Sequence, residues 1–397
     1  HEIGHTLGFG HNWNSSINER ASVMEYPTPR VSVSPSGQLD LSEAFETDVG
    51  AYDVFMARYA YTDFSPAKEN EGLEAIIDEM RKEGVLYTPS TDPRWSWYDD
   101  LDSPVKYLKE TVAARKIMLD YYGPGILREG EPIGELRDMR LWMTYLHHRW
   151  GIEHAIDFIG GMYHENVVKG DDLSLLPPTR IVPAELQREL LGLLLEVIKP
   201  ENLAIPERIL SALTTNSFST HLEDMSENYA FDHLRAARIL SALVVEEILQ
   251  PDRAARLVAF SDRQEDALTL PEVIDALLSE SWMTKRRADP DMNSLIRVTQ
   301  RVVLDALMIL GSHEETTPET RAVVFQILVE LTASLSDRHE KDRVTEAHLR
   351  QAERDIARFL VDPESVTPKS ASPAWGKRPR SRYPLAPGPP LGGGPIR

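Results

Sequence analysis

Hydrophobic positions recur at intervals of three and four residues over most of this chain, and runs that alternate apolar with polar residues are scarce. This period is typical of helices that bury one face. Proline, glycine, aspartate and serine interrupt the pattern at many points, and such residues commonly start or end helices. The pattern therefore predicts a mainly α protein. The expected helices lie near residues 66–83, 103–122, 135–165, 183–198, 231–249, 251–261, 270–280, 290–311, 317–336 and 344–360.

One more helix is expected ahead of these, with Ser42 as its N-cap. Its apolar residues recur at spacings of three or four and are Phe45, Val49, Tyr52, Phe55, Met56 and Tyr59. Such a stripe predicts a face that packs against the core. The aromatic content leaves a second interpretation open, in which the same face lines a substrate pocket.

The composition narrows the possible functions. Hydrophobic residues make up 42% of the 397 residues, which is enough to bury a core. The net charge of −20, mixed along the expected helices, indicates a well-solvated surface and argues against a nucleic-acid partner, which would need a basic face. The absence of cysteine excludes disulfides, thiolate zinc sites and cysteine nucleophiles. No apolar run reaches about 18 residues, so no transmembrane helix is expected.

The first eleven residues, HEIGHTLGFGH, carry the clearest chemical signal. His1 and His5 are one helical turn apart on the same face, where two imidazoles can reach one ion at about 2.0–2.1 Å. Gly8 lets the chain turn sharply, so that His11 can supply a third ligand. Three neutral imidazoles with an open fourth position predict Zn²⁺ as the cofactor. Glu2, about 100° around the helix, is the candidate general base for a water at that position.

This segment resembles the signature of the metzincin metallopeptidases, H-E-x-x-H-x-x-G-x-x-H, and matches it at every specified position. Metzincins also have a methionine turn beneath the metal. Thirteen residues after His11 the chain reads SVMEYP, so the resemblance implies that Met24 packs under the histidines. It also implies that Tyr26 is a weak extra ligand or stabilises the oxyanion, although a tyrosine packed in the turn is the alternative. Glu25 stands where astacins usually have histidine.

Three segments, HEIGHTLGFGHNW, ASVMEYP and DVGAYDVFMARYAY, resemble the sequences of the large bacterial zinc-dependent metalloproteases related to EcxA-like metzincins most. The resemblance covers residues 1 to about 360. The resemblance implies that residues 1–64 form the lower, C-terminal half of a metzincin catalytic domain and that residues 65–360 form a large helical domain. It also implies that the upper half of the cleft precedes this segment in a longer polypeptide. Because such bacterial enzymes are typically exported, we expect a periplasmic or extracellular location.

Residues 361–397 differ in composition from the rest of the chain. Nine prolines, several glycines and six Lys or Arg residues without an acid after Glu364 predict a disordered basic tail. This tail could recruit a partner through its PxxP-like sequence, or it could be a plain flexible end.

Three other clusters are interpreted as structural. Four histidines lack a repeated i, i+4 pairing and are not expected to form a second metal site: His147, His148, His154 and His164. Two groups of aspartates lack the twelve-residue calcium loop and are interpreted as capped, solvated turns: Asp99, Asp100 and Asp102, and Asp171 and Asp172. Three aromatic residues are expected to pack a loop: Trp95, Trp97 and Tyr98.

Two hypotheses of function follow. In the first, the protein is a zinc-dependent endopeptidase that cleaves a peptide or protein substrate by metal-activated water, with Glu2 as general base and Tyr26 beside the oxyanion. In the second, the protein is a helical binding or scaffold module whose zinc site is structural or vestigial. The second hypothesis is kept because roughly three quarters of the chain is helix outside the zinc motif.

Overall fold

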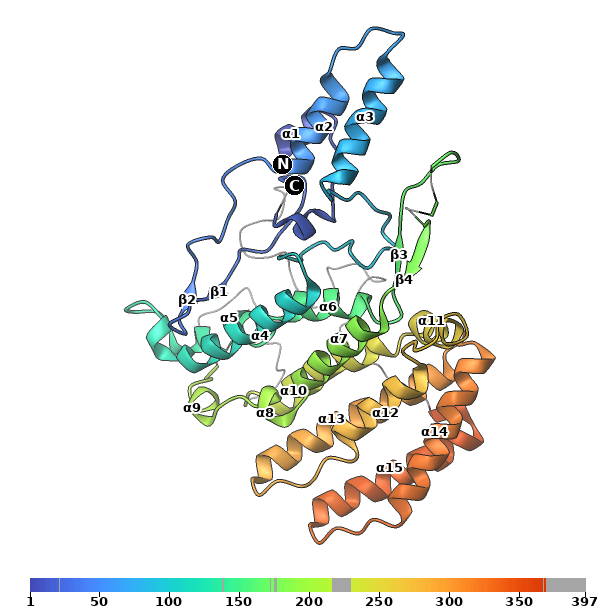
Figure 1. Cartoon of the computed structure of the whole chain (residues 1–397). Coiled ribbons are helices and arrows are strands. Elements are labelled where there is room, and N and C mark those ends of the chain that lie inside the picture. Colours follow the sequence, from blue (N-terminus) through green and yellow to red (C-terminus); the bar gives the residue numbers. More distant parts are fainter. Residues whose placement is uncertain are drawn as a thin grey trace.

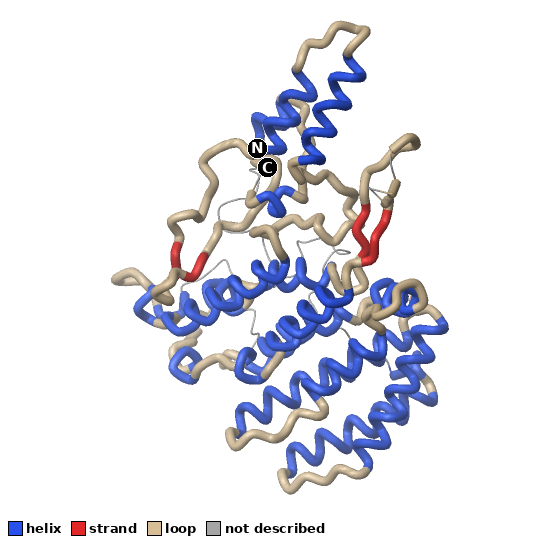
Figure 2. The backbone as a smooth tube through the Cα atoms, viewed as in Figure 1, coloured by secondary structure: helices blue, strands red, loops and turns tan. Residues whose placement is uncertain are grey.

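Helices form most of the structure, as the sequence pattern predicts. The computed structural model describes residues 1–20, 22–137, 139–171, 173–174, 177–215, 230–366 and 368. Within these ranges the strands form two short antiparallel hairpins, which Figure 2 shows in red. In one, β1 (Ser32–Val33) pairs with β2 (Leu39–Asp40), and in the other β3 (Met162–His164) pairs with β4 (Thr179–Ile181). The mainly α prediction is confirmed.

The helices have the following bounds. The α-helices are α1 Glu2–Thr6, α2 Ala51–Tyr61, α3 Glu69–Lys82, α4 Pro104–Tyr121, α5 Met139–Tyr145, α6 Arg149–Asp157, α7 Ala184–Val197, α8 Pro200–Leu203, α9 Glu207–Leu210, α10 His233–Ile248, α11 Pro251–Ser261, α12 Leu270–Ser281, α13 Pro290–Ser312, α14 Pro318–Ser336, α15 Arg343–Val361 and α16 Pro363–Val366. The 3₁₀ helices are η1 Ser15–Asn18, η2 Pro124–Ile126 and η3 Ile133–Leu136.

A large helical body is built from α4 onward (Figure 1). The long helix α13 packs against α10, α12, α14 and α15, and one continuous apolar core runs through these helices and through α4 to α7. Local sequence sets the ends of these helices. Asp289, Thr317 and Asp342 each cap a helix by accepting a backbone N–H bond, and proline takes the first position of α13 and α14. Among the described residues, no helix has both the length and the apolar composition needed to cross a membrane.

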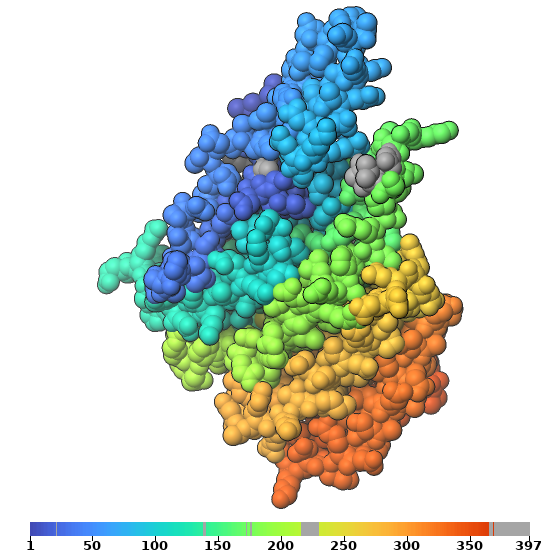
Figure 3. Space-filling model, viewed as in Figure 1, coloured from blue at the N-terminus to red at the C-terminus, as the bar shows by residue number. Residues whose placement is uncertain are grey.

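A smaller part containing α1, α2 and α3 stands above this body. Figure 3 shows the α2–α3 hairpin projecting from one end of the molecule, with the N-terminal residues between it and the helical body. Helices α2 and α3 lie on opposite sides of the predicted domain division at residue 64, yet they pack on each other and share one apolar cluster with Phe9 and Met24.

Three features differ from the sequence expectations. The helix expected from Ser42 begins instead at Ala51, and Phe45 and Val49 are exposed in the loop before it. Asp53 accepts the N–H of Gly50 at 2.7 Å, which holds the start of α2 there. The expected helix over 135–165 is divided into η3, α5, α6 and β3. The first residues of the predicted tail include α16, and its other residues, apart from Pro368, lie outside the described ranges.

Candidate metal centre

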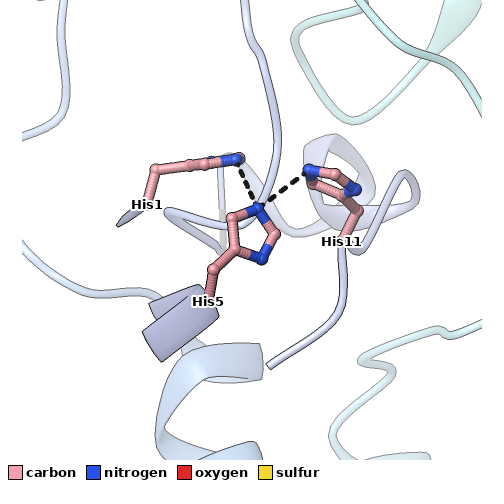
Figure 4. A group of neighbouring side chains, drawn as sticks. All are labelled: His1, His5 and His11. Carbon is pink, nitrogen blue, oxygen red and sulfur yellow. Dashed lines mark hydrogen bonds between the residues drawn. The ribbon is translucent and has the colours of Figure 1, made fainter. Parts of the chain in front are cut away.

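Three imidazoles converge at the N-terminal end of the chain (Figure 4). His5 lies between the other two, with its Nε2 atom 3.1 Å from Nε2 of His1 and 3.2 Å from Nε2 of His11. One nitrogen from each ring lies within 4.8 Å of the other two. Two ligands at about 2.0–2.1 Å from a tetrahedral zinc are roughly 3.3 Å apart. The spacing around His5 therefore fits zinc, whereas the His1 and His11 nitrogens, within 4.8 Å of each other, must come closer together to bind one ion.

The opposite ring nitrogens show why these imidazoles suit a metal. Nδ1 of His1 donates to the carbonyl of Val23 at 2.7 Å, and Nδ1 of His5 donates to the carbonyl of Phe9 at 3.0 Å. With Nδ1 as the donor, each neutral ring leaves Nε2 as a bare acceptor. Bare acceptors this close to one another repel unless a cation lies between them. The donor set therefore fits the ion that the motif predicts, and the carbonyls orient its ligands.

The local backbone explains how three ligands come from eleven residues. His1 caps α1 and His5 lies in its last turn, one helical turn later. Gly8 then takes a left-handed conformation with φ of +85°, as its place in the motif predicts. The N–H of Phe9 folds back to the carbonyl of Gly4 at 2.9 Å, which ends the helix. The chain then runs back so that His11 faces the two rings on α1.

Met24 lies directly beneath α1, where the resemblance to metzincins places a methionine turn. Its side chain is fully buried, and it belongs to the apolar cluster shared by Phe9, Tyr52 and Phe55. A Cβ added at Gly4 would lie only 2.2 Å from the sulfur of Met24. Gly4, between the two helical ligands, therefore leaves the space that the methionine fills. Sequence reasoning missed this glycine, although a residue without a side chain between His1 and His5 was a visible signal.

The methionine turn is tied to α2 by one carboxylate. Asp53 accepts the hydroxyl of Ser22 at 2.8 Å and the N–H of Val23 at 2.9 Å, and the same carboxylate caps α2. The N–H of Met24 in turn donates to the Ser22 hydroxyl at 2.8 Å. Since the carbonyl of Val23 orients His1, this chain of hydrogen bonds links α2 to a ligand. Sequence reasoning did not identify Asp53, because the contact joins residues thirty positions apart.

Tyr26 and Glu2 both lie at the histidine cluster, but Tyr26 contacts the histidine rings and Glu2 is exposed. The Tyr26 ring stacks on His1 with 4.4 Å between ring centroids, and its hydroxyl lies at hydrogen-bond distance, 3.2 Å, from Nε2 of His11. Glu2 is exposed and makes no hydrogen bond or ion pair with any described residue. Its charge nevertheless reaches the site. Burial and the charge of His5 lower the pKa of His11, while Glu2 raises it. Burial raises the pKa of Tyr26, and Glu2 adds to that shift.

An aromatic surface continues from the third ligand. Trp13 stacks on His11 with a centroid distance of 4.5 Å. It also contacts Trp95 and Trp97, at 5.8 Å and 5.7 Å, and Trp97 remains 37% exposed. The loop that these tryptophans pack therefore lies beside the imidazole cluster. The sequence predicts that these aromatic residues pack a loop, and the fold places that loop at the metal site.

The comparison with known families adds an independent observation. A family model described as Met-zincin matches residues 1–289. The chain belongs to the Met-zincin family. This membership indicates a zinc metallopeptidase and a dependence on zinc. The match extends through α12 and ends just before α13, so the family pattern includes much of the helical body. Neither the curated proteins nor the solved structures contain a match to this chain. The closer relation to EcxA-like enzymes stays a prediction.

Two buried acids lie behind the methionine turn of this Met-zincin. Oε1 of Glu25 accepts the N–H of Ser15 at 3.2 Å, and Asp99 accepts the hydroxyl of Ser16. Burial raises the pKa of Asp99 to about 8, and burial together with Asp99 raises the pKa of Glu25 well above its usual range. His154 lies 3.6 Å from Asp99, but burial lowers its pKa to about 4, so it carries no charge at neutral pH. Asp99 therefore keeps its proton at neutral pH.

The interpretation of Asp99 and Asp100 as solvated turn residues is wrong. Both are almost completely buried, at 1% and 2% exposure. Asp100 receives paired hydrogen bonds from Arg20 and from Arg30, which connect the loop around the methionine turn to the segment that precedes α4. These arginines lower the pKa of Asp100 despite its burial. Asp172 lies outside the described residues.

A pH dependence of stability follows from Asp99. The folded protein holds its proton up to about pH 8, whereas an unfolded aspartate releases it near pH 4, so the folded state binds more protons between these values. Stability from this proton is therefore present at low pH and lost as the pH rises through that window, by at most about 1.4 kcal/mol per pH unit. We expect Asp99→Asn to flatten the decline of unfolding free energy measured in urea between about pH 5 and 7.5.

The measurement is made with a chelator present, so that metal binding does not contribute to the slope. Asp102→Asn is the matched control, because Asp102 lies three residues away and is exposed. Equal slopes for the wild type and Asp99→Asn would show that Asp99 does not retain its proton in the folded state.

Proposed function

We propose that this protein is a zinc-dependent endopeptidase that hydrolyses peptide bonds, with zinc held by His1, His5 and His11. One observation carries the proposal: three Nε2 atoms converge while backbone carbonyls take the Nδ1 protons of His1 and His5. A zinc ion with an open fourth position supplies Lewis acidity toward the scissile carbonyl and lowers the pKa of an attacking water. The substrate class is a peptide or protein chain.

The chain's own residues then perform the proton transfers. The Glu2 carboxylate is free to accept the proton of the attacking water, because no described residue pairs with it. The resulting carboxylic acid delivers that proton to the leaving amine nitrogen as the C–N bond breaks. The Tyr26 hydroxyl donates a hydrogen bond to the oxygen that gains negative charge at the carbonyl carbon. Its stacking on His1 holds the hydroxyl at the edge of the cluster. Trp13 and Trp97 offer an apolar wall for the substrate beside His11.

Two measurements on the full-length protein test the function. We expect about one zinc per chain by elemental analysis, and cleavage of a peptide library that is abolished by 1,10-phenanthroline and restored by added zinc. The isomer 1,7-phenanthroline, which does not chelate, should leave cleavage unchanged. Bound zinc without chelator-sensitive cleavage would favour the scaffold hypothesis, in which the site only fixes the fold. Location in the periplasm or outside the cell is proposed on family grounds alone.

A further inference from the structure

A cavity of about 270 Å³ lies between the chain that follows the methionine turn and helices α4 to α6. Thr28 and Pro29 form part of its wall, two and three residues after Tyr26. Apolar and aromatic side chains supply much of the rest, among them Met118, Met143 and Trp150. Ligand pockets begin at roughly this size and are mostly apolar with a few polar groups. The polar groups of this cavity therefore decide what it can hold.

Arg149 gives the cavity a buried positive charge that no carboxylate of the described residues pairs with. Its side chain is only 9% exposed, and it forms no ion pair with any described residue. One guanidinium nitrogen donates to the carbonyl of Leu146 at 3.1 Å, while Nε has no hydrogen-bond partner. Burial lowers the pKa of Arg149 to about 10, and the charges of Tyr107, Glu153 and Tyr98 oppose that shift. The group therefore stays charged at neutral pH.

The surroundings of Arg149 add positive charge. Arg115, on α4, is also buried, has no ion pair with a described residue, and has an unpartnered nitrogen. Burial and these two arginines lower the pKa of His147 to about 4, so the histidine does not add to the charge. Arg149 is also the first residue of α6, where the helix dipole favours anions, and the first turn of α6 contains no acid.

The carboxylates that line the cavity are engaged elsewhere. Asp100 is held by Arg20 and Arg30, and Glu110 accepts the N–H of Val33 at 2.6 Å. Burying an unpaired charge is costly, and a chain with a net charge of −20 had many acids that could have paired with Arg149. A bound anionic ligand in the cavity would account for the buried charge of Arg149.

We propose that this cavity binds a small organic carboxylate with an apolar body. The carboxylate pairs with the guanidinium of Arg149, and the apolar body packs against Met118, Met143 and Trp150. Two sources share this chemistry, a free aryl or acyl acid and the C-terminal carboxylate of a peptide. The site is separate from the zinc chemistry and does not depend on the proposed peptidase activity.

The test uses the full chain in the presence of a chelator, so that a carboxylate cannot bind at the three histidines. We expect 4-phenylbutyrate to bind saturably at one site by calorimetry, and its neutral amide to bind at least about tenfold more weakly. Arg149→Met should weaken binding of the acid by about tenfold or more. Arg343→Met is the matched control, because Arg343 is also the first residue of a helix but is exposed, and it should bind as the wild type does.

A second variant keeps Arg149 in place. Val31→Phe fills part of the cavity and should also weaken binding. N-acetylphenylalanine carries the carboxylate of a peptide C-terminus and is compared with 4-phenylbutyrate. If N-acetylphenylalanine binds more tightly, the natural ligand is a peptide end. If it binds more weakly, the natural ligand is a free acid. The proposal is overturned if acid and amide bind equally, if folded Arg149→Met binds the acid as the wild type does, or if no binding saturates below about 10 mM.

Discussion

Replacing Glu2 with glutamine is expected to lower the rate of peptide cleavage by about 10²- to 10⁴-fold while zinc remains bound. The amide is close in shape to the carboxylate but cannot accept the water proton. Because the zinc ligands are the three imidazoles, the metal content should stay at the wild-type level. Glu2 is exposed and makes no contact with a described residue that would stabilise the fold, so the melting temperature should also be unchanged. Single-turnover cleavage, zinc content and thermal unfolding are measured on the same samples.

Glu69→Gln provides the matched control. Glu69 is an exposed glutamate at the start of α3, and the substitution changes the charge by the same amount away from the histidines. It should leave cleavage at the wild-type rate, which separates the general base from an effect of net charge. If Glu2→Gln retained its zinc and still cleaved peptides at the wild-type rate, Glu2 would not be the base, and another group would have to take the proton.

The long helices could be predicted because their apolar periodicity coincides with capping residues. Helix α13 shows this agreement: Asp289 caps it, Pro290 begins it, and apolar residues at helical spacing bury one side. The expected range of 290–311 ends one residue from the observed helix. The zinc motif was predictable for a similar reason. Its ligands are near in sequence, and helical spacing with one left-handed glycine is enough to bring them together.

At Ser42 an apparent N-cap together with apolar periodicity predicted a helix start that is wrong. Phe45 and Val49 have helical spacing to later apolar residues, but they lie in an exposed loop, and α2 begins where Asp53 can bind Gly50. The residues that hold the zinc ligands and the methionine turn in place were harder to predict, because their contacts join positions that are far apart in the sequence. Asp99 illustrates the point: it reads as a polar turn residue, and only the fold places it behind the methionine turn beside Glu25.

Gly4 and Met24 provide the strictest test of how the site is supported. In Gly4→Ala the new Cβ would lie 2.2 Å from the sulfur of Met24 and 3.3 Å from its terminal methyl group. Met24 is fully buried, so its sulfur cannot move into solvent, and either α1 or the methionine turn must shift. Overpacking of this kind costs about 1–3 kcal/mol. A shift of α1 against the turn also disturbs the bond from His1 to the Val23 carbonyl. We expect zinc affinity to fall by about 10- to 100-fold.

Competition with a zinc-binding dye measures the affinity, and thermal unfolding measures the stability. Gly10→Ala is the matched control, because Gly10 lies in the loop after α1 and a Cβ there would make only an ordinary contact, 3.9 Å from the Tyr87 hydroxyl. Gly4→Ala combined with Met24→Ala should recover part of the lost zinc affinity, since the shorter side chain removes the clash. That recovery distinguishes steric conflict from loss of backbone freedom at Gly4. Wild-type affinity and stability in Gly4→Ala alone would mean that the methionine does not press against α1 as the structure places it.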